Sequence, residues 1–366
     1  MTTTSVPYTH GTDTLDAWMA SKGVFTSAVD SSKKGLVEAL KIALRHHCDT
    51  NPYYRAYCKA LAFDIDTLSV ETLDTIPFMP NAVFKNSPEV LRPAGGDVVA
   101  TTSSGTQGTV SVIYRDNLTL QRFFATVQAG VEEVLGLDGG EITSRNVGPT
   151  LADSRHLWLA YVMSGVSVFH DTQFYVREDG LHAEELISDL RLDPVESQVA
   201  VIGPPPLLLE VALKLATEPL PLSAERKVIA MGGWKRRDNQ RISSEEFDAA
   251  VTRGFGLRDS TQVRDSFNMV ELNTVMFECG HRRKHCPPWL HIAVLEPQSL
   301  AAVAEGEMGI LAYADPTPTS FPGMILSDDF GHVERGCECP CGITSDVLTI
   351  DRRINRVENR GCAMKI

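Results

Sequence analysis

The sequence predicts an α/β protein, in which sheets layered with helices are joined to a β-rich, barrel-like subdomain. Three observations support this fold class. Between residues 98 and 275, short apolar runs alternate with helical patterns, as expected for a sheet covered by helices. From residue 276 to residue 351, the apolar runs are separated by turn signals and little helix is indicated. Before residue 98, the periodicity is largely helical.

The composition is that of a soluble globular protein with a large core. The 366 residues include 43% hydrophobic and 22% charged residues, and the net charge is −13. This acidic balance argues against nucleic acid as a partner. Residues 1–11 lack the basic and apolar regions of a secretory signal, and the apolar run at 204–216 is too short to span a membrane. We therefore expect a cytoplasmic protein that has no membrane partner and keeps its cysteines mostly reduced.

The N-terminal part is expected to be mainly helical over residues 12–65. The pair Asn51-Pro52 interrupts its helical periodicity and predicts a break in the helix. The segment from Ile76 to Lys85 contains two prolines, which favour an extended chain. This segment leads toward the most distinctive stretch of the sequence.

That stretch, residues 101–109, is rich in hydroxyl groups and glycine, and we call it the bend. Apolar runs at 98–100 and 110–114 flank it, which predicts a strand on either side. Hydroxyls and backbone N–H groups crowded on one loop suit phosphate oxygens, and glycine lets the backbone approach a ligand closely. No G-K-[ST] sequence stands at the spacing of a Walker A loop. From these residues alone, phosphate binding and an ordinary polar turn remain equally open.

Helices and strands alternate after the bend, and short strands follow them. A capping residue at Asp116 or Asn117 begins the first helix, and Gly136 ends it. The other predicted elements are strands at 199–202 and 228–231, helices at 207–215 and 245–251, and short strands at 290–295, 309–313 and 324–326.

The bend and five later motifs stand in an order that resembles the adenylate-forming (ANL) superfamily. Each short motif is a weak signal alone, but their common order favours nucleotide chemistry over coincidence. The acyl-protein synthetase and phenylacetate–CoA ligase branches are the most similar, and the resemblance covers the chain from about residue 50. The motifs are Ser103–Thr109, Gly232-Gly233, Phe267-Asn268-Met269-Val270-Glu271, Gly306–Leu311, Ser327-Asp328-Asp329-Phe330-Gly331 and Arg352 ahead of Arg360-Gly361, with Ile76-Pro77-Phe78 and Phe84-Lys85 resembling the first branch.

The resemblance implies an ATP- and Mg²⁺-dependent ligase that converts a carboxylic acid into an acyl-adenylate. Glu271 would hold Mg²⁺, which prefers oxygen ligands, Phe267 would offer a flat face to adenine, and Asp329 would bind the ribose hydroxyls, as acidic residues do in other nucleotide sites. The implied catalytic residues are Thr106, Glu271 and Arg352. The implied nucleotide-binding residues are Ser103, Ser104, Gly105, Thr106, Gln107, Gly108, Gly232, Gly233, Phe267, Asn268, Glu271, Asp329 and Arg352.

The sequence departs from the superfamily pattern in three places. Asn268 stands where the aromatic-Gly-x-x-Glu motif has glycine, and Thr109-Val110-Ser111 replaces the lysine that follows the last glycine in many relatives. The chain stops at Ile366, so we expect the C-terminal domain, with its catalytic lysine, to be absent. Adenylation could then be slow, partner-dependent or lost. The expected parts are an N-terminal helical part at 1–97, an α/β nucleotide-binding subdomain at 98–275, a β-rich subdomain at 276–351 and a hinge remnant at 352–366.

Six of the eight cysteines lie between residues 279 and 362. Three thiolates and one imidazole fit a closed tetrahedral zinc site, and the phenylacetate–CoA ligase branch has a similar Glu-Cys…His…Cys-x-Cys-Gly arrangement. By that resemblance the ligands of a structural Zn²⁺ are Cys279, His285, Cys339 and Cys341, with His281, Cys286 and Cys337 as substitutes. Unmetallated buried thiols are the alternative, and a disulfide framework is a weaker one.

Cys362, four residues from the end of the chain, is a candidate acyl acceptor. Acyl-protein synthetases are thought to carry the acyl group on a cysteine near the C-terminus, and a thiolate could take it from the adenylate. An ordinary exposed cysteine is an equally good interpretation.

The substrate is expected to be an aromatic carboxylic acid. A closer resemblance, to the atypical adenylating proteins of phenazine antibiotic (D-alanylgriseoluteic acid) biosynthesis, implies a phenazine carboxylate that is handed to a partner reductase. The first alternative is an acyl-protein synthetase that moves a fatty acyl group onto Cys362. The second is a non-catalytic protein that binds a nucleotide and an aryl acid. A homodimer is possible, because the sequence does not determine the oligomeric state.

Overall fold

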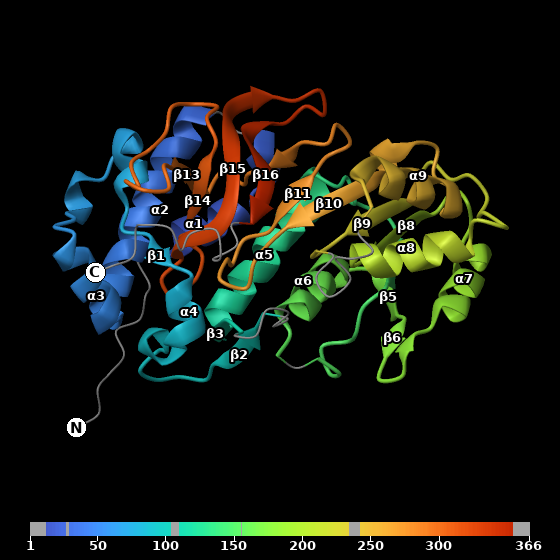
Figure 1. Cartoon of the computed structure of the whole chain (residues 1–366), viewed down its shortest axis with the longest axis horizontal. Coiled ribbons are helices and arrows are strands. Elements are labelled where there is room, and N and C mark those ends of the chain that lie inside the picture. The colour runs from blue at the N-terminus through green and yellow to red at the C-terminus, as the bar shows by residue number, and fades with distance from the viewer. Residues whose placement is uncertain (1–11, 27–28, 104–109, 155, 234–241, 354–366) are drawn as a thin grey trace.

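A twelve-stranded sheet connects the two halves of the molecule (Figure 1). The computed structural model describes residues 12–26, 29–103, 110–154, 156–233 and 242–353. The strands of this sheet are β1 (Met79–Pro80), β4 (Ile142–Asn146), β5 (Asp171–Phe174), β8 (Gln198–Gly203), β9 (Lys227–Ala230), β10 (Val263–Phe267), β11 (Met276–Glu278), β12 (Lys284–His285), β13 (His291–Leu295), β14 (Gly309–Ala314), β15 (Met324–Glu338) and β16 (Thr344–Arg353). Their order is β13-β14-β15-β16-β12-β11-β10-β9-β8-β4-β5, and β1 pairs with β15 outside this path.

The half of the sheet from β10 to β5 is parallel and is covered by helices on both faces. In β8, Val199 and Val201 join the core formed with α7, α8 and α9, whereas Ala200 and Ile202 join the larger core that includes α5 and α6. This alternation is the period of a strand buried on both faces. The helices are α5 (Asn117–Glu133), α6 (Trp158–Ser167), α7 (Ala183–Leu192), α8 (Pro205–Lys214) and α9 (Ser244–Gly254).

The half from β11 to β13 is antiparallel and is packed against the N-terminal helices. Asn51 begins one of them by accepting a hydrogen bond from the Tyr54 N–H (2.8 Å), with Pro52 in the first helical position. The predicted break at Asn51-Pro52 is therefore confirmed. The elements are α1 (Thr12–Met19), α2 (Val29–Thr50), α3 (Pro52–Ala60) and α4 (Ala82–Asn86), with short 3₁₀ turns η1 (Val24–Thr26), η2 (Ile65–Thr67), η3 (Val70–Thr75) and η4 (Pro88–Leu91), and η6 (Ser260–Gln262) in the parallel half.

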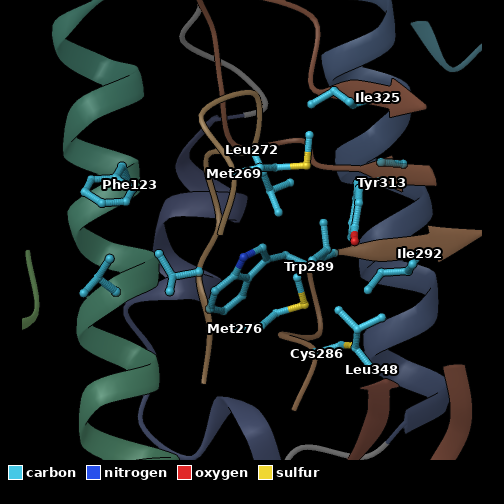
Figure 2. Close-up of a cluster of buried hydrophobic side chains, with 14 of the residues drawn as sticks. Phe123, Met269, Leu272, Met276, Cys286, Trp289, Ile292, Tyr313, Ile325 and Leu348 are labelled. Atoms are coloured by element: carbon cyan, nitrogen blue, oxygen red, sulfur yellow. The ribbon is translucent and has the colours of Figure 1, made fainter. Parts of the chain in front are cut away.

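Helix α5 runs between the two halves and shares its core with both (Figure 1). It begins at Asp116, whose carboxylate accepts a hydrogen bond from the Thr119 N–H (2.7 Å). Gly130 lets it approach β11, because a Cβ atom there would lie 2.4 Å from the Phe277 ring. Trp289 lies fully buried in the core beyond it, among the side chains shown in Figure 2.

Most predicted elements are present, and the differences have physical causes. The strand expected at 324–326 is the fifteen-residue β15, which also contains the Ser327–Gly331 motif. Strand β4 was not predicted, because its sequence includes Ser144 and Arg145. Both are buried with partners: Ser144 with His170 (2.6 Å) and Arg145 with Asp193. The fold class is thus the expected one, whereas the proposed subdomain boundaries remain a prediction.

Two small hairpins complete the fold. One consists of β2 (Val99–Thr102) and β3 (Val112–Arg115), the strands expected on either side of the bend, and the other of β6 (Val176–Arg177) and β7 (Gly180–Leu181). In the part of the chain that the structure describes, each helix is too short or too polar to cross a membrane.

Candidate active site

The order of the parallel strands reverses at β4, and this switch point is where a ligand site is expected. Strand β4 connects to β5 on one side, and the chain then returns to form β8 on the other side of β4. In open α/β sheets, ligands bind outside the carboxyl ends of the strands at such a point. Gly203 ends β8. Of the residues predicted to bind the nucleotide, Gly232 follows the end of β9 and Phe267 ends β10. Gly232 has a φ of +75°, a conformation that suits glycine.

The foot of the bend lies next to Glu271. Ser103 and Ser111 close it with two hydrogen bonds: the Ser103 N–H donates to the Ser111 carbonyl, and the Ser111 N–H donates to Ser103 Oγ, both over 3.1 Å. The Ser111 hydroxyl donates to a carboxylate oxygen of Glu271 over 2.5 Å. The Glu271 residue is buried, with 5% of its surface exposed. Ser104, Gly105, Thr106, Gln107 and Gly108 lie outside the described residues.

The loop after β4 also lies against this hairpin. The His156 carbonyl accepts hydrogen bonds from the Thr102 N–H (2.5 Å) and hydroxyl (3.1 Å), and the His156 ring lies 3.0 Å from the Ala100 carbonyl oxygen. The bend is thereby joined to the switch point of the sheet. Sequence reasoning missed this connection, because it depends on a contact across more than fifty residues.

Asn268, which the sequence assigned to the nucleotide site, holds its own loop in place. Its amide N–H groups donate to the carbonyls of Leu272 (3.1 Å) and Thr274 (2.8 Å), and its carbonyl oxygen accepts from the Trp158 indole N–H. A glycine could make none of these bonds. Asn268, which stands in place of the motif's glycine, therefore acts as a clamp: it holds its own loop through Leu272 and Thr274, and it fixes the Trp158 side chain.

Phe267 is half-buried and stacks on Tyr313 of β14, with ring centroids 5.9 Å apart. This contact links the end of β10 to the β-rich half. One face of Phe267 is therefore occupied by protein. Its predicted role toward adenine remains a prediction.

Arg115, which the sequence did not single out, is bonded to Thr101 at the start of the bend. It is fully buried at the end of β3 and donates hydrogen bonds to the Thr101 hydroxyl, the Val270 carbonyl (2.5 Å) and the Asn273 side-chain oxygen (3.4 Å). Burial lowers the pKa of Arg115 to about 9, although the nearby carboxylate of Glu271 acts in the opposite direction. A lone arginine on a short strand carries no sequence signal for such a role.

Asp329 and Arg352 lie together on the β15–β16 hairpin, farther along the sheet. Asp329 is buried, and its N–H donates to the Ser327 hydroxyl (3.0 Å). Arg352 pairs in register with Phe330, and its exposed guanidinium lies 5.5 Å from the centre of that ring. The structure thus places Asp329 and Arg352 on paired strands, and it brings Glu271 to Ser111 at the foot of the bend.

The neighbouring Asp328 has a structural partner in the segment ahead of the bend. It accepts hydrogen bonds from Asn81 (2.8 Å) and Lys85 (3.2 Å). Strand β1 of the same segment pairs with Ile325 and Leu326 of β15. The segment from Ile76 to Lys85 therefore joins β15 before the chain reaches the bend. It was expected to be extended throughout, but its end forms helix α4 from Ala82 onward.

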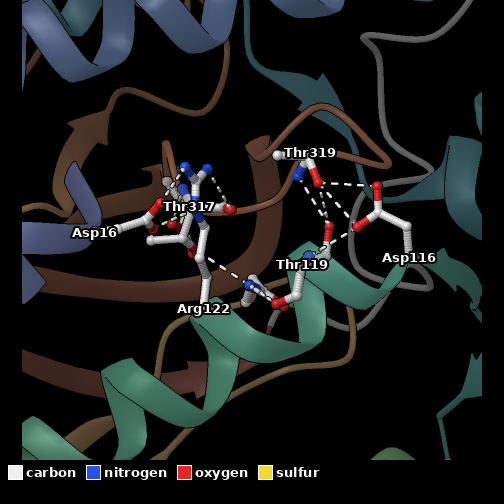
Figure 3. A network of polar contacts seen from close by, with 8 residues as sticks. Asp16, Asp116, Thr119, Arg122, Thr317 and Thr319 are labelled. Atoms are coloured by element: carbon white, nitrogen blue, oxygen red, sulfur yellow. Dashed lines mark hydrogen bonds and ion pairs between the residues drawn. The ribbon is translucent and has the colours of Figure 1, made fainter. Parts of the chain in front are cut away.

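A polar network holds the loop after β14 against the start of α5 (Figure 3). The Thr319 hydroxyl donates to Asp116 (2.9 Å), and its N–H donates to the Thr119 hydroxyl (2.9 Å). One turn later, Arg122 binds both Asp16 (2.7 Å) and the Thr317 carbonyl (3.3 Å). These contacts fix α5, and with it the hairpin that precedes it, to the β-rich half.

The cysteine cluster forms at the far end of the β15–β16 hairpin. The ligand atoms of Cys279, His285, Cys339 and Cys341 all lie within 4.8 Å of one another. The Cys279 and Cys339 sulfurs are 3.7 Å apart, close to the edge of about 3.8 Å that a tetrahedron of Zn–S bonds would give. His285 Nδ1 is bonded to the Ser345 hydroxyl (2.8 Å), so its Nε2 faces the cluster, 3.3 Å from Cys341. This donor set fits Zn²⁺, with a second-shell partner for the histidine.

Two turns of the same geometry present these cysteines. In each, the N–H of the first cysteine donates to the carbonyl four residues later: Cys279 to Arg283 and Cys339 to Ile343, both over 2.9 Å. The fourth residue of each turn has a positive φ: +59° at Arg282 and +92° at Gly342. The positive φ could be predicted from the sequence only in the second turn, where the fourth residue is glycine.

The substitute ligands lie outside the four-residue cluster. Cys286 faces away toward a cavity of about 210 Å³ between α2, η3 and β13, and Cys337 contacts Arg283. His281 occupies the place in its turn that Cys341 occupies in the other. Within the described residues all cysteines are free thiols, so the disulfide alternative has no pair there. Cys362 lies outside the described residues.

The sequence matches the family described as "Acyl-protein synthetase, LuxE" over residues 12–366. It is 33% identical over 331 residues to the long-chain-fatty-acid–luciferin-component ligase of Aliivibrio fischeri, covering 88% of this chain and 85% of the relative. The ligase of the same name from Vibrio harveyi is 30% identical over 332 residues, covering 89% and 86%.

Solved structures show the same fold at low sequence identity. A 2-hydroxyisobutyryl-CoA ligase in complex with 2-HIB-AMP and CoA superimposes with a TM-score of 0.70 and 16% identity, covering 91% of this chain and 70% of that one. An open conformation of that ligase gives a TM-score of 0.67 and 17% identity, covering 88% and 69%. The architecture is thus that of an adenylate-forming enzyme core.

Proposed function

Since the chain belongs to the acyl-protein synthetase (LuxE) family and is an adenylate-forming ligase, we propose that it activates a long-chain fatty acid. The fatty acid would be converted into an acyl-adenylate at the expense of ATP, and the acyl group would then pass to a cysteine thiol. The relatives reported above are named for long-chain fatty acids, which favours such an acid over the phenazine carboxylate suggested by the sequence.

One observation carries the proposal for the site: the Ser111 hydroxyl joins the foot of the bend to the Glu271 carboxylate over 2.5 Å. Phosphate-binding groups and a metal-binding carboxylate need to be neighbours, because Mg²⁺ is held by one or two carboxylates together with substrate phosphates. Glu271 would be that carboxylate. The bound ion would neutralise charge on the phosphates as the pyrophosphate leaves.

The first step is an attack by a carboxylate oxygen of the acid on the α-phosphorus of ATP. A P–O bond to the acid forms, the bond to pyrophosphate breaks, and no proton has to move. A substrate carboxylate is already ionised at neutral pH, so the chain's contribution is positioning and charge stabilisation. Asp329 would bind the ribose, and Arg352 would lie near the phosphates or the ribose.

The second step is an attack by a thiolate on the acyl carbon. The acyl C–S bond forms and AMP leaves with the bonding electron pair. Cys362 is the proposed thiol in this chain, and a partner protein would be the later acceptor. A reductase remains the expected partner.

We further propose that Cys279, His285, Cys339 and Cys341 hold a structural Zn²⁺. Four protein ligands leave no open position, which is the arrangement of structural rather than catalytic zinc. The ion would fasten the turn after β11 to the tip of the β15–β16 hairpin. The nearness of the four ligand atoms supports this assignment.

Carboxylate-dependent exchange of labelled pyrophosphate into ATP tests the activation step. The panel consists of fatty acids of increasing chain length, benzoate and a phenazine carboxylate. Exchange that is strongest with long-chain fatty acids supports the proposal, whereas exchange with the aryl acids alone restores the aromatic interpretation. Absence of exchange with every acid, together with binding of ATP, would indicate a non-catalytic binding protein.

Intact-protein mass spectrometry after incubation with ATP and the best acid tests the transfer step. An added acyl mass that is lost in Cys362→Ser, but kept in Cys337→Ser, supports Cys362 as the acceptor. An adduct that persists in Cys362→Ser places the acyl group on another residue.

A further inference from the structure

We propose that Arg115 is a positioning residue that holds the loop bearing Glu271 against β2, the strand that enters the bend. This inference rests on the proposed role of Glu271 in binding Mg²⁺. It concerns a side chain that belongs to none of the motifs recognised in the sequence.

The contacts of Arg115 join the two parts of the site. One guanidinium nitrogen donates to the Thr101 hydroxyl, on the strand that enters the bend. Another donates to the carbonyl of Val270, the residue before Glu271, over 2.5 Å. Nε donates to the side chain of Asn273 over 3.4 Å. A single rigid group thus bonds to the bend strand and to both sides of Glu271.

The surroundings require an arginine rather than a lysine. The guanidinium lies 3.5 Å from the centre of the Trp158 ring and 5.3 Å from that of Phe321. A planar cation can stack on a ring and still donate several hydrogen bonds in its plane, which a lysine ammonium cannot do. Trp158 is itself fixed by its bond to Asn268, so the stack also connects the bend to the end of β10.

Acidic groups near Arg115 compensate its charge, and among the described residues its hydrogen-bond partners are neutral. The carboxylates of Glu271 and Asp315 are the nearby acidic groups that favour its charged form. Asp315 is fully buried, and one of its oxygens accepts the Thr317 N–H (2.9 Å). A buried cation near two acidic groups offsets part of the cost of burying their charges. It therefore allows a metal-binding carboxylate to stay in a buried position.

The proposal predicts the sign of a measurable effect. If Arg115 acts only by its charge, a lysine in its place keeps that charge near Glu271 and leaves the Mg²⁺ dependence unchanged. If Arg115 positions Glu271, the lysine loses the planar set of hydrogen bonds, the carboxylate is displaced and Mg²⁺ binding weakens. The two roles therefore predict different Mg²⁺ dependences for a variant that keeps the charge.

The experiment measures how the thermal stabilisation by a non-hydrolysable ATP analogue depends on Mg²⁺ concentration. The proteins are the wild type, Arg115→Lys, Thr101→Val and the control Arg226→Lys. Arg226 is also a fully buried arginine bonded to backbone carbonyls, Pro221 (3.2 Å) and Phe255 (2.6 Å). It lies in the core of the parallel half, at the start of β9, and matches Arg115 in burial.

The Mg²⁺ concentration for half-maximal stabilisation should rise about tenfold in Arg115→Lys, which corresponds to about 1.4 kcal/mol. It should rise a few-fold in Thr101→Val and stay unchanged in Arg226→Lys. Thr101→Val keeps the buried cation and tests the proposal even if Arg115→Lys fails to fold. An unchanged or lowered Mg²⁺ requirement in a folded Arg115 or Thr101 variant overturns the positioning role.

Pyrophosphate exchange by the wild type separates this inference from the proposed function. If the wild type binds the analogue with Mg²⁺ but shows no exchange with any acid, the proposed activity is contradicted. The shift in Mg²⁺ dependence between wild type and variants then still tests the positioning role of Arg115. Wild-type protein that exchanges normally, with variants of unchanged Mg²⁺ dependence, contradicts the role of Arg115 alone.

Discussion

The bend region and the cysteine cluster are assembled in different ways, although both were predicted from motifs. The cluster is made of two local turns with the same hydrogen bonds, which present Cys279 and Cys339 in the same manner. The foot of the bend is made of long-range contacts, such as those of Ser111 with Glu271 and of Thr102 with His156. The cluster thus depends on local backbone geometry and on the ion that we propose, whereas the bend depends on buried polar contacts between distant segments.

The largest expected effect is the loss of the ion from the cluster. Cys279→Ser removes one of the four proposed ligands, so zinc should be absent and the free energy of unfolding should fall by on the order of 5 kcal/mol, part of the roughly 10 kcal/mol that zinc supplies to zinc-finger peptides. Metal content by mass spectrometry and thermal unfolding measure the two quantities. Cys337→Ser is the control, because this thiol lies outside the cluster, and should keep the metal. If the wild-type protein contains no stoichiometric metal, the cluster is a set of thiols and an imidazole without an ion.

The next effect concerns the bend. Glu271→Gln keeps an acceptor for the Ser111 hydroxyl but removes the charge that Mg²⁺ requires. Pyrophosphate exchange should therefore fall by roughly 100-fold, about 2.7 kcal/mol of barrier, with the fold retained. Glu185→Gln on α7, an exposed carboxylate paired with Arg177, should change nothing. Equal exchange rates for Glu271→Gln and the wild type would remove the carboxylate from the metal site.

The sequence range of the contacts in each region explains how much of that region could be predicted from the sequence alone. The four cluster residues lie together, and they were named through the resemblance to the phenylacetate–CoA ligase branch. The Cys-x-Cys spacing gives a local signal only for Cys339 and Cys341. The strands on either side of the bend and the cap at Asp116 were also local, and they are present. Arg115 and the clamp formed by Asn268 were missed, since their roles come from partners such as Thr101 and Trp158 that are brought close only by the fold.

The third prediction concerns the pH dependence of the contact between α2 and the loop after β14, which packs on α5 and so supports the bend region. His47 is fully buried on α2, and its Nε2 lies 3.1 Å from the Pro318 carbonyl, in the loop that packs on α5. Burial, and then the nearby His46, lowers the pKa of His47 to about 3. The groups facing it are the His46 ring on its own helix, the edge of the Tyr54 ring and the Pro318 carbonyl.

The sign of the effect follows from these values. The unfolded chain takes up a proton near pH 6.5 and the folded chain near pH 3, so the stabilising contribution is present above pH 6.5 and is lost as the pH falls toward 3. At pH 5 the free energy of unfolding should be about 2 kcal/mol lower than it is well above pH 6.5. Denaturant unfolding of the wild type and His47→Gln at pH 8 and pH 5 measures it: the variant should have the smaller difference between the two pH values. Parallel pH dependences would mean that His47 is not a source of acid sensitivity.

The smallest expected effect tests whether the turns of the cluster depend on backbone geometry itself. Gly342 has a φ of +92°, and a Cβ atom there would meet nothing within 4 Å. Gly342→Ala should therefore cost about 1 kcal/mol of unfolding free energy through backbone strain alone. Gly342→Asn is the matched variant, because asparagine tolerates the left-handed region better than alanine, and it should cost only a few tenths of a kcal/mol. Arg282 already adopts this conformation in the other turn and forms ion pairs with Asp248 and Glu278, which help to offset its strain. Equal losses for the alanine and asparagine variants would show that the turn is held by the ligands and not by its backbone.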